Sequence, residues 1–210
     1  MIANFTAVSL RRRAAAILFA AALLTFASCA VAPVQLPPNV SVVQGGQYNA
    51  SYIDKVDFTY KSAQSPDFGK LKLCIAESVT NDAVQLRDSS GSFVGAATRH
   101  YYQVGNTQSV GGGSVFKYID DSKSTLIANG VTVAGAGNLT QDYVRFELKS
   151  AVTPNEVQIQ FYSVTRAQAN TGAASNDGFA PVGIWQGSRS PEVYSSLEAV
   201  AAKVKGCLQG

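Results

Sequence analysis

Residues 10–29 hold three consecutive arginines, an uncharged apolar run and a group of small residues, in that order. This order is typical of a secretory signal, which directs export and is then removed. The apolar run, residues 14–27, is shorter than the roughly 20 residues that a membrane-spanning helix needs. We therefore predict a signal peptide over residues 1–28, so that only the chain after it folds, in an oxidising space outside the cytoplasm.

The end of this segment, Phe26-Ala27-Ser28-Cys29, resembles the bacterial lipobox, in which the cysteine is lipidated and becomes the first residue of the mature protein. The resemblance implies lipidation of Cys29, and Ala30 after it implies sorting to the outer membrane. An ordinary cleaved signal remains an alternative, because Phe26 is less usual than leucine at its position. On the lipobox interpretation the chain is an outer-membrane lipoprotein that faces the periplasm or the cell surface, with the membrane as its first partner.

Removal of the signal changes the charge of the chain. Lys and Arg fall from 17 to 14 because Arg11, Arg12 and Arg13 are lost, and Asp and Glu stay at 14. A neutral domain without a cluster of basic residues lacks the electrostatic surface of a nucleic-acid-binding protein. It also lacks a polybasic patch for anionic lipids, so we expect membrane attachment through the anchor and no nucleic-acid partner.

Cys74 and Cys207 are the two cysteines left once Cys29 is assigned to the lipid. An even pair of cysteines in an oxidising compartment favours a disulfide. A metal site or a redox pair fits less well, because the chain has one histidine and no Cys-x-x-Cys motif. We predict a Cys74–Cys207 disulfide, no metal and no cofactor.

Proline, glycine and the period of the apolar residues divide the mature chain. Residues 29–47 have three prolines and two glycines without apolar periodicity, which predicts a lipidated cysteine and a tether before a single domain over 48–210. Apolar residues recur every three or four positions in 66–80 and 190–207, after Ser-Pro-Asp and Ser-Pro-Glu starts. These patterns predict two amphipathic helices.

Alternating apolar and polar residues predict strands with one buried face. The clearest pair is 143–149 and 157–162, joined by a turn at 153–156, and it should pair antiparallel. Two segments, 105–114 and 169–187, lack periodicity and are expected to be loops. Turn-forming residues separate the other expected strands, which cover 56–60, 84–87, 93–103, 115–119 and 125–133.

This order of strand, helix, about six strands and helix predicts an α+β domain, with an antiparallel sheet of about six or seven strands and both helices on one face. The order resembles the helix-grip fold of carriers of lipophilic ligands. Residues 117–121 (Lys-Tyr-Ile-Asp-Asp), 127–130 (Ile-Ala-Asn-Gly) and the long hairpin after them also resemble small secreted bacterial domains described as TBP-like. Those domains have no assigned activity, so the resemblance implies a fold and no reaction.

Three patterns suggest chemistry, and each has an ordinary structural explanation. Ser114 and Lys117 fit a Ser-x-x-Lys motif, but they fall in an expected strand, whereas that nucleophile opens a helix. His100 is the one histidine and stands among expected strand residues. Asp120 and Asp121 suit a turn, which explains them without a metal. No Gly-x-Ser-x-Gly, His-Glu-x-x-His, phosphate-binding or calcium-binding motif is present, so no catalytic residue is predicted.

Two surfaces are candidates for binding. Trp185, the one tryptophan, lies with Phe179 in segment 169–187, either as a cover over the core or as part of a binding loop. The predicted water-facing row of the clear hairpin is polar and aromatic, as protein-contact surfaces often are. That row consists of Tyr143, Arg145, Gln158, Gln160 and Tyr162. If the chain binds a partner, the glycines on both sides of Trp185 favour the loop over the sheet.

Three functions stay open. A non-catalytic interaction or structural module that binds an envelope protein is favoured, because catalytic motifs are missing and the sheet face is polar and aromatic. A carrier or sensor of a small apolar molecule comes second and requires a cavity between the sheet and the second helix. An enzyme comes third and requires a carboxylate or tyrosine site without a known motif.

Overall fold

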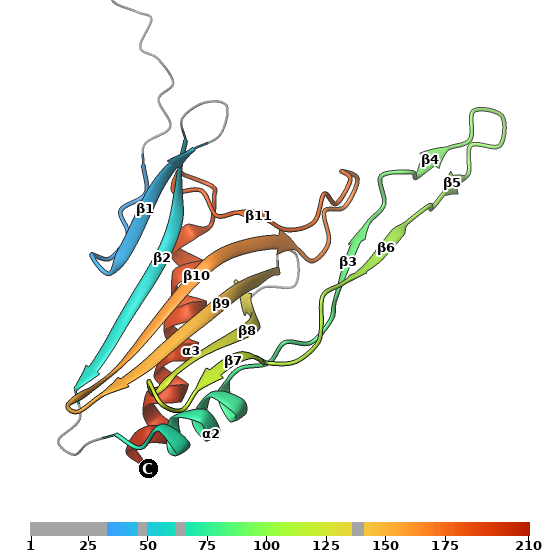
Figure 1. Ribbon diagram of the computed structural model, residues 1–210. Coiled ribbons are helices and arrows are strands. Elements are labelled where there is room, and N and C mark those ends of the chain that lie inside the picture. Colours follow the sequence, from blue (N-terminus) through green and yellow to red (C-terminus); the bar gives the residue numbers. More distant parts are fainter. Residues whose placement is uncertain (1–32, 46–49, 62–65, 136–140) are drawn as a thin grey trace, which may run out of the picture. The chain divides into compact units, whose positions relative to one another are not determined.

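The computed structural model describes residues 33–45, 50–61, 66–135 and 141–210 (Figure 1). They belong to one unit, Pro33–Gly210. The predicted signal peptide and Cys29 lie outside the described residues, so both stay predictions. Among the described residues, no helix is long and apolar enough to cross a membrane.

Seven strands form one antiparallel sheet, which confirms the predicted α+β class. The strands are β1 (Val40–Gly45), β2 (Ala50–Lys61), β7 (Phe116–Asp120), β8 (Thr125–Ala134), β9 (Asp142–Thr153), β10 (Glu156–Gln168) and β11 (Ala180–Pro181). Their order across the sheet is β1-β2-β10-β9-β8-β7, and the short β11 pairs with β10. The sequence of pairings therefore places the β9–β10 hairpin at the centre of the sheet.

The β9–β10 hairpin is the predicted one, and the structure confirms it. Pairing runs from the turn at 153–156 to Asp142 opposite Gln168. Because side chains alternate along a strand, one face of each strand enters the core and the other faces away from it. The buried residues that the two strands contribute to this core are Val144, Phe146, Leu148, Val157, Ile159, Phe161 and Val164.

A β-bulge at Ser163 divides β10 into two parts. The register of β10 against β9 shifts between Tyr162 and Thr165, and Ser163 has a φ of 51°, which is uncommon for a residue with a side chain. The pairing of β10 with β2 ends at Tyr162, opposite Lys55. The two strands separate beyond the bulge.

Segment 180–184 lies where β2 and β10 have separated. It begins with β11, and two backbone hydrogen bonds then join it to β2, from Ile53 N to Val182 O (2.9 Å) and from Ile184 N to Ser51 O (3.1 Å). These bonds satisfy backbone groups that the separated strands would otherwise leave without partners. Part of the predicted loop 169–187 is therefore a strand-like element of the sheet.

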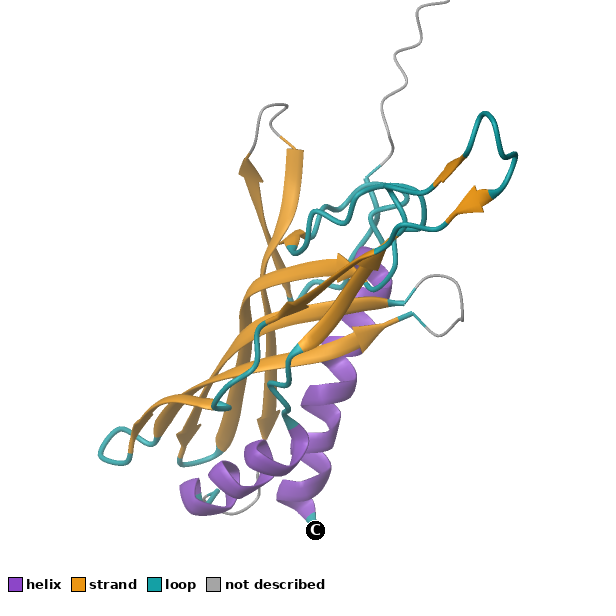
Figure 2. Ribbon diagram, turned by 90° about the vertical axis from the view of Figure 1, so that its right-hand side faces the viewer, coloured by secondary structure: helices purple, strands orange, loops and turns teal. Residues whose placement is uncertain are grey.

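Two helices, α2 (Phe68–Ser78) and α3 (Ser190–Gln209), cover one face of the sheet (Figure 2). Helix α2 begins two residues later than predicted, because the carboxylate of Asp67 accepts a hydrogen bond from Gly69 N at 2.8 Å and so caps it. Helix α3 follows Arg189, which has a left-handed φ of 62°, and carries the expected proline in its first turn.

Side chains of the sheet and of α3 fill the interface between them. Phe161 is fully buried, and its ring meets Phe146 and Phe58 edge-on, with centroids 5.0 and 5.9 Å apart. Val193 and Leu197 of α3 are fully buried in the same cluster. The middle of the helix–sheet interface is therefore occupied by the protein itself.

The prediction of a tether over residues 29–47 is wrong for its second half. Residues 40–45 form β1, which pairs along its length with β2, and Leu36 packs against the core. Valine favours strands, but β1 is an edge strand on which Val42 and Val43 are exposed. It therefore has no alternation of buried and exposed apolar residues that a sequence pattern could show.

Cys74 of α2 and Cys207 of α3 lie at disulfide distance, with their Cα atoms 5.6 Å apart. Cys74 is fully buried where the two helices meet. The two residues are 133 positions apart, so a bond between them closes a long loop in the unfolded chain.

Loss of this bond should lower the free energy of unfolding. The chain-entropy model gives about 4–5 kcal/mol for a closed loop of this length, and less where the denatured chain keeps residual structure. Urea unfolding of the oxidised protein, the reduced protein and a Cys74→Ala/Cys207→Ala variant measures the difference. Two titratable thiols besides Cys29 in the denatured, unreduced mature protein would contradict the bond.

Candidate binding surface

A β-hairpin arm, residues 84–110, projects from the main sheet (Figures 1 and 2). It starts with β3 (Val84–Asp88) and β6 (Asn106–Val110), which pair antiparallel along their whole length. Further out, β4 (Phe93–Val94) pairs with β5 (Tyr101–Tyr102). We call residues 92–104 the arm tip, and β3 with β6 the arm base.

The predictions for residues 93–103 and 105–114 are wrong. Segment 93–103 is not one strand but a hairpin with its own turn, in which Gly95 N donates to His100 O at 2.9 Å and Arg99 N donates to Gly95 O at 2.8 Å. Arg99 has a φ of 56° in this turn. Segment 105–114, predicted to be a loop, contains β6. Both errors arise because β4, β5 and most of β6 are exposed on both faces, so no buried face imposes alternation on them.

The arm base packs against the sheet face opposite the helices. Its cluster is formed by buried Val84, Leu86 and Ala167, together with the partly buried Val110, Val131, Tyr143 and Phe179. The edge of β3 that does not pair with β6 contacts residues 169–172 in a strand-like way. Arg87 N donates to Ala169 O at 2.9 Å, and Ser89 N donates to Gly172 O at 2.6 Å. The predicted loop 169–187 therefore also supports the arm.

Asp88 joins the segments that meet at the arm base. It is 8% exposed, and its carboxylate accepts hydrogen bonds of 2.7–3.1 Å from the backbone and hydroxyl of Ser90, from the side chain of Asn106 and from Asn176 N. These bonds, above all those from Ser90, lower the pKa of Asp88 from 3.8 to about 2. The charged carboxylate thus stabilises the junction of β3, β6 and the loop after β10.

Replacement of Asp88 by asparagine should loosen the arm. The backbone amides of the arm should then exchange hydrogen faster at neutral pH. In the wild type the same loosening should appear as the pH falls from about 4 to 2, because a carboxylate with a lowered pKa stabilises the fold above its unfolded pKa and loses that effect on protonation. Hydrogen exchange read by mass spectrometry over residues 89–110 measures both effects.

Asp120→Asn is the matched control for this experiment. Asp120 also has its pKa lowered to about 2, mainly by the hydroxyl of Ser122, but it lies at the β7–β8 turn. The control should leave exchange in the arm unchanged. Equal protection of the arm in wild type and Asp88→Asn at pH 7, or a wild-type arm as well protected at pH 2 as at pH 7, would contradict the role of Asp88.

The arm tip carries large apolar side chains that the described chain leaves uncovered. Val94 and Tyr101 are each 63% exposed, and Phe93, Tyr102 and Val104 are exposed as well. The rings of Phe93 and Tyr102 stack on each other with centroids 5.1 Å apart. Exposed apolar groups gathered in one place mark interaction sites more often than single ones do.

Three predicted binding residues meet at the arm base instead of facing water. The guanidinium of Arg145 lies 4.8 Å over the ring of Phe179 and donates to Val110 O at 3.4 Å, while Tyr143 belongs to the base cluster. Gly111, with a φ of 79°, permits this approach, since a Cβ there would overlap the guanidinium. The prediction of an open row at Tyr143 and Arg145 is wrong, because these residues fasten the arm to the sheet.

Tyr162 belongs to a polar group further along the same sheet face. Its hydroxyl donates to Glu147 Oε2 at 3.0 Å, and Lys117 Nζ lies 2.7 Å from the same oxygen. The bond from Lys117 lowers the pKa of Glu147, and burial together with Glu147 raises the pKa of Tyr162 to about 12. This group is internally paired, so Tyr162 has a structural role on β10.

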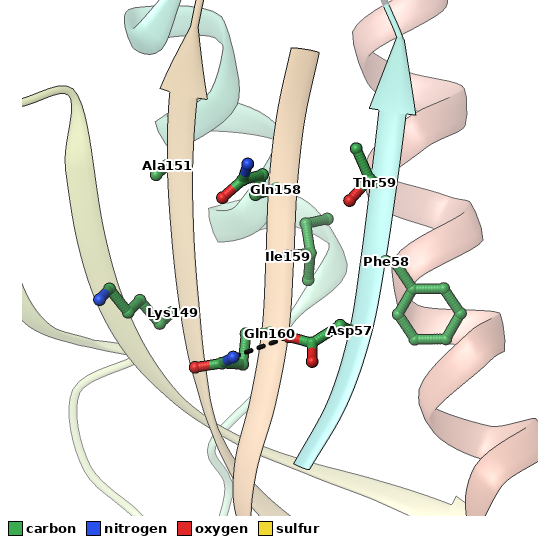
Figure 3. A pocket seen from close by; sticks show the side chains of 8 residues that line it. All are labelled: Asp57, Phe58, Thr59, Lys149, Ala151, Gln158, Ile159 and Gln160. Atoms are coloured by element: carbon green, nitrogen blue, oxygen red, sulfur yellow. Dashed lines mark hydrogen bonds between the residues drawn. The ribbon is translucent and has the colours of Figure 1, made fainter. Parts of the chain in front are cut away.

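Beside this group lies a polar hollow of about 300 Å³ on the outer face of β2, β10 and β9 (Figure 3). Gln160 Nε2 donates to Asp57 Oδ1 at 2.7 Å across it, and Phe58 points instead toward α3. Its lining is completed by Thr59, Lys149, Ala151, Gln158 and Ile159. The lining offers amide, hydroxyl, carboxylate and ammonium groups, which can form hydrogen bonds with a polar ligand.

Trp185 covers the end of the sheet where segment 180–184 is inserted. The half-buried ring lies against Gly183 and meets Tyr52 edge-on, with centroids 5.6 Å apart. A backbone bridge joins Trp185 to Pro33. Phe179 instead faces the arm base, so the two aromatic residues of the predicted binding loop do not form one surface.

The contact between Trp185 and Gly183 can be tested by a double-mutant cycle. Trp185→Ala should cost about 2 kcal/mol of unfolding free energy, below the 3–5 kcal/mol of a fully buried ring. Gly183→Ala should cost about 1–3 kcal/mol, because the added methyl overlaps the indole. In the Trp185→Ala background the same glycine substitution should cost much less. Additive costs in urea unfolding would show that the indole does not cover Gly183.

None of the residues that suggested chemistry is joined to a catalytic partner within the described ranges of the chain. Ser114 Oγ donates to Phe116 O at 3.0 Å, and Lys117 pairs with Glu147, so this serine and lysine are not joined. His100 is exposed at the arm tip. Asp121 pairs with Lys72 at 2.6 Å. In the part of the chain that the structure describes, no group of three or more His, Cys, Asp or Glu side chains is placed to hold a metal ion.

The arm tip is the feature that the sequence analysis missed. Its signal was present as two apolar pairs, Phe93-Val94 and Tyr101-Tyr102, because neighbouring residues of a strand point to opposite faces. Such pairs cannot bury both side chains in a single one-sided sheet. Comparison with family models, with curated proteins and with solved structures gave no match, so no family is assigned to the chain.

Proposed function

We propose that this protein is a lipoprotein of the bacterial outer membrane that works as a non-catalytic interaction module, with the arm as its binding element. The observation that carries the proposal is the arm tip, where apolar and aromatic side chains stand exposed at the end of a projecting hairpin. The basic, apolar and small-residue order before Cys29 supports export and lipidation.

The arm base supports this role because it holds the arm in place. Asp88, the Arg145–Phe179 contact and the β3 contact with segment 169–172 fix the base to the sheet. An isolated two-stranded ribbon is marginally stable in water, so a long hairpin needs such support. A tip of exposed apolar residues on an anchored base is suited to contact with another surface.

The packing of the core favours this proposal over a carrier, and the hydrogen bonds of the outer carboxylates favour it over an enzyme. A carrier needs a cavity between sheet and α3, and the middle of that interface is filled by Phe146, Phe161, Val193 and Leu197. An enzyme needs an aligned nucleophile, acid or base. The carboxylates on the outer face are instead held in hydrogen bonds. Asp57 accepts one from Gln160, and Glu147 accepts one each from Lys117 and Tyr162.

Trypsin cleavage after Arg99 tests whether the arm binds. Arg99 is exposed at the tip, and Lys123, whose side chain is 78% exposed at the β7–β8 turn, is the matched internal control. In isolated envelopes cleavage at Arg99 should be slower than in the detergent-solubilised protein, while cleavage at Lys123 should be unchanged. Equal cleavage at Arg99 in both preparations would contradict binding by the arm.

Metabolic labelling with a fatty-acid analogue tests the anchor separately. The wild type should incorporate the label, and Cys29→Ser should not. The Cys29→Ser protein should also keep its signal peptide or be lost from the membrane fraction. A wild-type protein without label would contradict lipidation of Cys29. It would not affect the trypsin test of binding by the arm.

A further inference from the structure

Both faces of the arm tip are apolar. Phe93 pairs with Tyr102 and Val94 pairs with Tyr101 in the antiparallel register. Because successive side chains alternate, the first pair lies on one face of the ribbon and the second pair on the other. A protein groove commonly covers one face of a hairpin, whereas a surrounding apolar medium covers both.

The charge of the arm fits the surface of a membrane. Residues 89–110 contain no Asp and no Glu, and Arg99 and His100 stand together at the turn. Aromatic side chains are enriched at the boundary between lipid and water, and basic side chains favour anionic lipid head groups. An acidic residue at the tip would oppose such contact, and the stretch has none.

The tip and the start of the described chain lie toward the same end of the unit. In both ribbon views the arm tip and the first described residues lie at the top, and the marked C-terminus lies at the bottom (Figures 1 and 2). Cys29 precedes Pro33 by four residues, which span at most about 14 Å. A lipid on Cys29 would therefore hold this end of the unit close to the bilayer.

We infer that the arm tip inserts into the lipid–water interface of the membrane to which Cys29 is anchored, as a second attachment point. The inference rests on the proposed lipidation and on the arm as the binding element. Val94, Tyr101 and the Phe93–Tyr102 stack enter the interface, and Arg99 lies at the level of the head groups. One lipid and one hairpin together fix the orientation of the domain on the membrane, which a single lipid cannot do.

Tryptophan quenching by nitroxide-labelled lipid tests the insertion. The lipidated protein carries Trp185→Phe and one new tryptophan, either Tyr102→Trp or Val94→Trp at the tip, on opposite faces. Leu73→Trp is the matched control, because Leu73 is an exposed apolar residue on α2. The proteins are reconstituted in vesicles of phosphatidylethanolamine and phosphatidylglycerol that carry the quencher near the head groups.

Both tip tryptophans should lose emission and shift to shorter wavelength, and the control should do neither. Arg99→Glu should reduce the quenching of both. Unquenched tips on vesicle-bound protein would overturn the inference. If trypsin protection at Arg99 persists in native envelopes in that case, the arm binds a protein there. Failure of the protein to stay with the vesicles would overturn the anchor itself, a result distinct from failure of the tip.

Discussion

The β9–β10 hairpin supplies both surfaces that the rest of the described chain uses, because its side chains alternate over a long antiparallel pairing. Its inner face carries Phe146 and Phe161 into contact with α3. Its outer face carries Tyr143 and Arg145 against the arm base. A shift of one residue in its register would exchange these faces and remove both layers at once.

The elements that the sequence predicted correctly are those with one buried and one exposed face. The alternation in 143–149 and 157–162 and the apolar stripe of α3 report burial directly, so pattern and structure agree there. β1, β6 and the arm tip carry no such signal, since β1 is an edge strand and the other two are largely exposed on both faces. Segment 180–184 was missed for another reason: its place depends on the Ser163 bulge, which opens a gap far away in the sequence.

The type of a residue predicted less about whether it is available for binding than did its place in the folded domain. Tyr143, Arg145 and Phe179 have the composition of a contact face, and they do form one, but the partner is the arm of the same chain. Trp185 likewise covers Gly183 and Tyr52. At the tip, by contrast, Phe93, Tyr101 and Tyr102 are left exposed to an external surface. Whether an aromatic residue packs against its own chain or stays exposed depends on tertiary contacts, and a short sequence pattern does not contain them.

If the protein is held at two points, as we propose, the link between Cys74 and Cys207 has a mechanical consequence. The arm leaves the body directly after α2, so a pull on the tip that exceeds what the arm-base contacts can resist would pass along β3 to that helix. α2 is short, and only Leu71, Cys74 and Ile75 of its side chains are buried, so few apolar contacts hold it against the rest of the domain. Once the bond is formed, that tension would pass through it into α3, the longer of the two described helices, which lies across the sheet. With that bond, a domain held by a lipid at one point and by the arm at another would bear load without its helices separating.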